Sequence, residues 1–238
     1  MPKHPRGNSP SQAKKPARRP TADFAAYIES RGSAFVAVVT IIAGQAWLVG
    51  RLALQPVWLL PTVSALLLIV SVLVYRSDLD EPSLTMRWIS RAVVVELALA
   101  NAALLGLVVR GIFVKSPLDP FGLLLAGLAL WTVNIAVFAL AYWEIDAGGP
   151  EDRASSRDTL PDLVFPQQTP DQDKLAPADW APGFLDYLYV SLTASTAFSP
   201  TDAMPYTRTA KVLMAVESTI SFAIVIMLVA RAVNIAKG

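Results

Sequence analysis

Long apolar runs alternate with short polar stretches along the chain after residue 32. Hydrocarbon cannot hydrogen-bond a peptide group, so a run of ~20 apolar residues spans a bilayer as a helix that satisfies its own backbone. The pattern therefore predicts an all-α polytopic transmembrane protein. Its five spans are predicted at residues 33–54, 56–75, 92–109, 121–143 and 208–234.

A sixth apolar segment, residues 183–199, is shorter and more polar than the others, and a turn region at 200–207 follows it. If this segment crosses the membrane fully, the N-terminus and the loop before the segment are cytoplasmic. If it is re-entrant, both are external, against the rule that basic flanks stay inside. Both arrangements place Arg231 and Lys237 in the cytoplasm. The sequence thus predicts five spans plus one re-entrant or sixth helix.

The pattern divides the chain into four parts. Residues 1–32 form a basic disordered tail and an interfacial lead-in, and residues 33–146 form a four-helix transmembrane region. Residues 147–182, rich in Pro, Asp and Gln, are expected to be a polar, exposed loop. Residues 183–238 contain the short helix, the turn and the last transmembrane helix.

Composition excludes several classes of active site. Hydrophobic residues make up 54% of the chain and charged residues 16%, whereas a soluble domain typically has about a quarter charged residues. Cysteine is absent and His4 is the only histidine, which excludes thiolate nucleophiles, His-based triads and multi-histidine zinc sites. We expect no enzymatic activity, no cofactor and no metal site.

Single polar residues inside the apolar runs have separate interpretations. Glu217 lies well inside the last span, where an unpaired carboxylate costs a few kcal/mol, so it is either a functional acid or a structural hydrogen-bond partner. Gln45, Asn101 and Asn134 are expected to bridge helices. Glu96 is expected to extend to the membrane interface.

Aromatic residues and prolines near the ends of the spans also carry structural expectations. Tyr142 and Trp143 are expected in an aromatic belt at the interface. Pro56 suits the first turn of its helix, and Pro61 is expected to kink that helix.

The last sixty residues carry the one arrangement with functional content. A hydroxyl-rich stretch, 191–196, is followed by Phe198-Ser-Pro-Thr-Asp202, by Pro205 and Arg208, and then by the long last helix. This order resembles the pore module of two-transmembrane potassium channels, with its pore helix, filter and inner helix. The chain is also similar to an uncharacterised family of bacterial polytopic membrane proteins that carry this stretch.

The resemblance covers about a quarter of the chain and implies a set of pore residues. Glycines let successive carbonyls of a potassium filter point at the ion; Ala197 and Ser199 stand near those positions and Pro200 is added, so potassium selectivity is not expected. The constriction residues implied are Thr193, Ser195, Thr196, Phe198 and Ser199, with Asp202 at the mouth, Glu217 as the intramembrane acid and Ser221 at the hinge.

The sequence favours one function and leaves two alternatives. The favoured function is an ion-channel-like homo-oligomer, with a tetramer implied by the resemblance, that lies in a bacterial inner membrane and contacts lipids and inorganic cations. The alternatives are a non-conducting scaffold or accessory subunit and a small proton-linked transporter. Nucleic acid is not expected as a partner, because the basic tail lacks interleaved aromatic residues.

Overall fold

The computed structural model of the chain describes residues 20–52, 59–77, 84–113, 118–154, 159–169, 177, 180–200 and 203–237. Most of the predicted basic tail, and Asp202, lie outside these residues. Four of the helices are long and apolar enough to span a membrane. These are α1 (Pro20–Arg51), α3 (Leu84–Phe113), α4 (Pro120–Ile145) and α7 (Arg208–Lys237). The prediction of a helical membrane protein is confirmed at this level.

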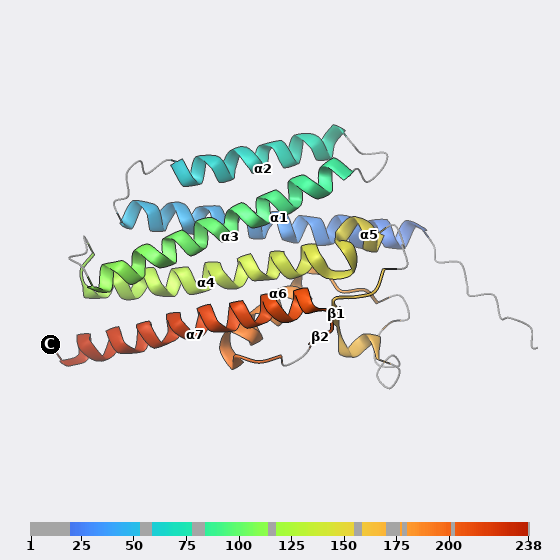
Figure 1. Cartoon of the computed structure of the whole chain (residues 1–238). Helices are drawn as coiled ribbons and strands as arrows, with labels where there is room; N and C mark the ends of the chain where they lie inside the picture. The colour runs from blue at the N-terminus through green and yellow to red at the C-terminus, as the bar shows by residue number, and fades with distance from the viewer. Residues whose placement is uncertain are drawn as a thin grey trace, which may run out of the picture.

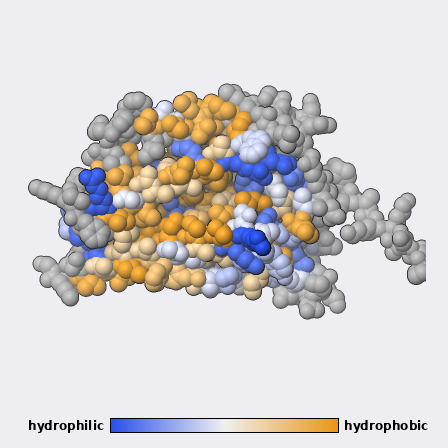
Figure 2. All heavy atoms as spheres, in the orientation of Figure 1, coloured by the Kyte–Doolittle hydropathy of each residue, from blue (hydrophilic) through white to orange (hydrophobic). Residues whose placement is uncertain are grey.

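Helix α4 is the centre of the bundle. It packs against α1, α3, α7 and the short helix α6 (Phe184–Ala197). Of its apolar stretch, 61% is buried inside the protein, against 22% for α7. Helix α2 (Leu59–Ser77) lies outside, on α1 and α3 (Figure 1). On the face in Figure 2, hydrophobic residues cover the middle of the helices and hydrophilic ones gather toward the ends.

The α2–α3 pair differs from the prediction at two residues. Pro61 lies in the first turn of α2, where its missing N–H is not needed, so it does not kink the middle of the helix. Glu96 does not extend to the interface. The hydroxyl of Ser64 on α2 instead donates its one hydrogen to the carboxyl of Glu96, whose two oxygens lie 2.9 and 3.0 Å from it, and this contact joins the outer helix to the bundle.

The boundaries of α3 differ as well. The third span was predicted at residues 92–109, but α3 begins at Leu84, so Arg87 and Arg91 lie inside the helix. Both side chains point to acidic or carbonyl partners at the end of the bundle, so they extend α3 beyond its apolar part.

Small residues allow the helices to approach each other closely. A Cβ added to Gly44 of α1 would lie 2.7 Å from a methyl group of Val133 on α4, and one added to Gly127 of α4 would lie 2.8 Å from Leu228 on α7. Glycine at helix contacts is typical of membrane proteins, where packing rather than the hydrophobic effect holds helices together.

The described part of the loop is folded onto the end of the bundle and is not the exposed loop expected. It contains the 3-10 turn η1 (Asp146–Gly148), α5 (Pro150–Ala154), β1 (Leu163–Val164) and the 3-10 turn η2 (Pro166–Gln168). Leu163 and Phe165 are buried in the hydrophobic core. We call this end of the bundle, with β2 (Met204–Pro205), the capped end.

Candidate functional site

Helices α6 and α7 are consecutive but run parallel. Ser191 of α6 contacts Glu217 of α7, and Ser195, one turn further along α6, contacts Ser221, one turn further along α7. Helix α6 has 14 residues, so it is about 21 Å long, shorter than the ~30 Å hydrocarbon core. The chain must therefore return from the inner end of α6 to the capped end before α7 begins.

This return is held at the capped end by backbone pairing. Strand β2 pairs antiparallel with β1. The N–H of Tyr206 donates to the carbonyl of Asp162 at 2.9 Å, and the hydroxyl of Thr207 donates to the carboxylate of the same residue. Residues 184–207 thus enter the bundle from one end and leave at the same end. We call them the helix-and-return segment.

The tip of this segment lies at the middle of α7. The ring of Phe198 packs edge-on against Phe222, with 5.2 Å between ring centroids, and Phe222 is halfway along α7. Phe198 ends α6 in a left-handed conformation, φ 55° and ψ 27°, which is strained for a bulky side chain. From Phe198 to Pro200 the backbone is non-helical and exposed on the surface of the protein.

A buried carboxyl group joins α4, α6 and α7 more than one helical turn from this tip, on the side of the capped end. Glu217 is 0% exposed, and its carboxyl is hydrogen-bonded to Tyr142 of α4 and to Ser191 and Ser195 of α6. All three partners are hydroxyls. Glu217 therefore connects the helix-and-return segment to both of its neighbouring helices.

The donors and acceptors around this carboxyl are best matched when Glu217 is protonated. The Ser191 hydroxyl lies within hydrogen-bond distance of two acceptors, Glu217 and the carbonyl of Ile135, 2.7 Å away, but it has one hydrogen. If Glu217 carries a proton, it donates to Ser191, which donates to Ile135, and every contact is satisfied. A neutral acid is also far less costly to bury than an unpaired carboxylate.

Polar contacts continue from this carboxyl toward α3. Ser221 donates to Ser195 at 2.9 Å, Asn134 of α4 donates to Ser221 at 3.3 Å, and Asn101 of α3 donates to Asn134 at 2.9 Å. Gln45 of α1 donates to the carbonyl of Leu97. The prediction that Gln45, Asn101 and Asn134 bridge helices is confirmed.

A second buried acid holds the capped end. One carboxylate oxygen of Asp146, at the end of α4, accepts from the N–H groups of Asp162 and Leu163, and the other accepts from the hydroxyl of Tyr187 at 2.6 Å. Burial raises the pKa of the Tyr187 phenol well above its usual value, so the phenol stays protonated and is the donor. Asp146 thus fixes β1 and the start of α6 on α4.

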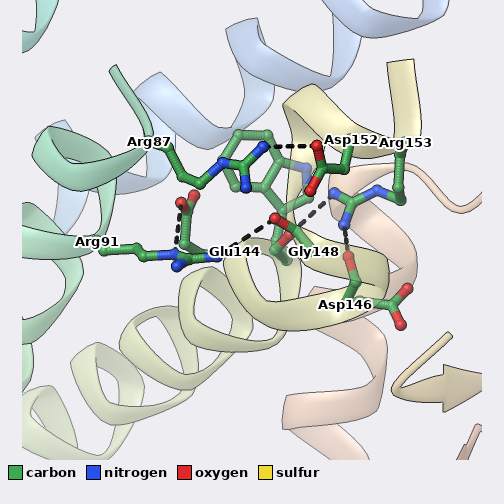
Figure 3. A network of polar contacts seen from close by, with 8 residues as sticks. Arg87, Arg91, Glu144, Asp146, Gly148, Asp152 and Arg153 are labelled. Carbon is green, nitrogen blue, oxygen red and sulfur yellow. Dashed lines mark hydrogen bonds and ion pairs between the residues drawn. The ribbon is translucent and has the colours of Figure 1, made fainter. Parts of the chain in front are cut away.

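Three arginines complete the capped end (Figure 3). Arg87 pairs with Asp152 at 2.5 Å, and Arg91 donates to the carbonyl of Gly148 and lies 4.0 Å from Glu144. Arg153 donates to the carbonyls of Asp146 and Trp143 at the end of α4. A cation is favourable there because the last carbonyls of a helix carry a partial negative charge.

The residues expected at a constriction separate into two groups. Ser195, Glu217 and Ser221 are buried within the protein and bond to one another. Thr196, Phe198 and Ser199 are exposed at the tip, and Thr193 is half-buried, with its hydroxyl bonded to carbonyls of its own helix. The structure therefore does not bring all the candidates to one surface.

Sequence reasoning missed Tyr142 and Asp146. The expectation that Tyr142 and Trp143 form an aromatic belt is wrong, because both are buried. A spacing of four or eight residues carries the signal: Asn134 and Tyr142 lie on one face of α4, and Asp146 follows directly at its end. Tyr187, Ser191 and Ser195 lie on the matching face of α6. Residues four apart share a helix face, so these two stripes and Glu217–Ser221 meet along one line.

The described residues contain no group of three His, Cys, Asp or Glu side chains that could hold a metal ion. Comparison with protein families, with curated proteins and with solved structures finds no match to this chain. The interpretation of the site therefore depends on its geometry.

Proposed function

We propose that the protein is ion-channel-like: several copies surround a water-filled pathway in a bacterial inner membrane, and the helix-and-return segment of each copy is re-entrant. Helix α2 is then the fifth span. The observation that carries this proposal is the exposed, non-helical backbone of Phe198–Pro200 beside the middle of α7. Backbone of this kind persists at membrane depth only where it is covered by protein or faces water.

The surface around the tip supports an arrangement of several copies. Helix α7 is the least buried of the four long apolar helices, and Phe222 and Ile226 are half-exposed on it. Neighbouring copies would cover this face, whereas Thr196 and Ser199 would face the pathway. Their hydroxyl oxygens would replace part of the hydration shell of a cation.

Glu217 has a structural part in this proposal. Its three hydroxyl partners all belong to the same copy, so it holds α6 at a fixed depth and does not line the pathway. Because Ser195 and Glu217 are used inside the protein, a non-conducting scaffold or accessory subunit is the second candidate function.

Cation flux into liposomes that contain the purified protein tests the proposal. We expect flux from the wild type and a reduction of several-fold in Thr196→Val. Thr132→Val is the matched control, because Thr132 is also exposed and its hydroxyl also donates to the carbonyl four residues earlier, but it lies on α4. If the wild type conducts no monovalent cation, or if native mass measurement finds a monomer, the scaffold function replaces the channel.

A further inference from the structure

The basic side chains described in the structure are divided unevenly between the two ends of the bundle. The capped end has five of them: Arg87, Arg91, Arg153, Arg208 and Lys211. The opposite end, where α1 and α3 finish and α7 approaches its C-terminus (Figure 1), has three: Arg51, Arg110 and Arg231.

The sequence next to these ends increases the difference. The chain that leads into α1 at the capped end carries six basic residues and no acid within positions 1–19. The connections and terminus at the opposite end add only Lys115 and Lys237. Orientation in a membrane follows the Lys and Arg residues of short flanking segments, and acids contribute little.

We propose that the capped end faces the cytoplasm and lies against the anionic phospholipids of the inner leaflet. Trp88 and Tyr206, each 67% exposed near this end, have the amphipathic rings that favour the headgroup level. The C-terminus then emerges on the opposite side of the membrane. This differs from both arrangements considered from the sequence, which place Arg231 and Lys237 in the cytoplasm.

The orientation has a consequence for the helix-and-return segment. Because both ends of residues 184–207 are attached to the capped end, the segment enters the membrane from the cytoplasm. A pathway that ends at its tip is open to the cytoplasm, with its narrow part near the middle of the membrane. The orientation itself needs no conduction and is tested separately from it.

Single cysteines report the orientation without background, because the chain has none of its own. Leu160→Cys places one at the capped end, where Leu160 is 88% exposed, and a cysteine added after Gly238 reports the other end. A membrane-impermeant maleimide should label the added cysteine in intact bacterial cells. It should label Leu160→Cys only after the cells are permeabilised.

Two outcomes would overturn the proposal. Labelling of Leu160→Cys in intact cells would place the capped end outside. Equal accessibility of both cysteines from one side would mean that α6 crosses the membrane fully. The first outcome would leave the liposome flux unaffected, because flux does not depend on which side the capped end faces, so loss of the orientation alone is distinguishable from loss of the channel function. The second outcome would also overturn the re-entrant segment on which the channel proposal depends.

Discussion

The hydroxyl group of Tyr142 on α4 donates a hydrogen bond to the carboxyl group of Glu217 on α7, inside the helix bundle. The same carboxyl bonds to Ser191 and Ser195 of α6. A short helix of 14 residues, with one strained residue at its inner end, thus has a fixed position between two long helices.

Replacement of Glu217 should distinguish the contribution of its hydrogen bonds to stability from that of its packing volume. Glu217→Gln keeps an acceptor for Tyr142 and a donor for Ser191, so we expect a small loss of thermal stability in detergent. Glu217→Leu removes all three of these buried hydrogen bonds and should cost about 2 to 3 kcal/mol, at roughly 1 kcal/mol each. Tyr142→Phe should lie between the two. Equal melting temperatures for the Gln and Leu variants would contradict the role assigned to the carboxyl.

Asp146 is predicted to control the order of the capped end. Asp146→Ala removes the acceptor of the Asp162 and Leu163 N–H groups and of the Tyr187 hydroxyl, so these amides should exchange hydrogen faster. Tyr187→Phe should have a smaller effect, since it keeps the hydrogen bonds from both backbone N–H groups to Asp146. Asp119→Ala is the control. Asp119 caps the other end of α4, and loss of this cap should lower the stability by about 1 kcal/mol. If Asp119→Ala increases hydrogen exchange at residues 162–163 as much as Asp146→Ala does, the effect is global, and Asp146 does not specifically hold β1 on α4.

The contact of Gly44 with α4 gives a prediction about packing. Gly44→Ala places a methyl group 2.7 Å from Val133 and should destabilise the bundle by about 1 to 3 kcal/mol, because the helices must separate. Gly50→Ala on the same helix meets nothing within 4 Å and should be neutral or slightly stabilising.

A second substitution decides the cause of that loss. Val133→Ala removes the methyl groups that the new side chain would meet, so it should restore part of the stability in the Gly44→Ala background. If the double variant is simply the sum of the two single ones in thermal unfolding, α1 and α4 are not in direct contact at this position.

The sequence was sufficient for the helices but not for the surroundings of single residues. Long apolar runs identify α1, α3, α4 and α7, because a bilayer requires self-satisfied helices of that length. Glu217 was identified as an acid at membrane depth, but its partners were not. Tyr142 lies 75 residues away, and hydropathy cannot distinguish a buried tyrosine from an interfacial one.

Residues 147–182 were interpreted least well. Their low hydropathy predicts an exposed loop, yet two short strands and the carboxylate of Asp146 fold part of them onto the bundle. Such strands consist of two residues each, too few for any periodicity. Their pairing depends on contacts between segments far apart in sequence, Leu163 with Pro205, 42 residues apart, and Val164 with Met204, 40 residues apart.

The last prediction concerns water at the tip of the helix-and-return segment. Ser199 is exposed close to the middle of α7, and lipid cannot hydrogen-bond its non-helical backbone. A thiolate reacts with water-soluble thiosulfonates far faster than a thiol in hydrocarbon, so Ser199→Cys should be modified in inside-out membrane vesicles. Ile226→Cys, one turn beyond Phe222 on the half-exposed face of α7, should react slowly because that face is covered by lipid or by a neighbouring copy. If both cysteines react slowly, the tip is dry and sealed by protein, which favours the scaffold; if Ser199→Cys alone reacts, water reaches the middle of the membrane from the capped end.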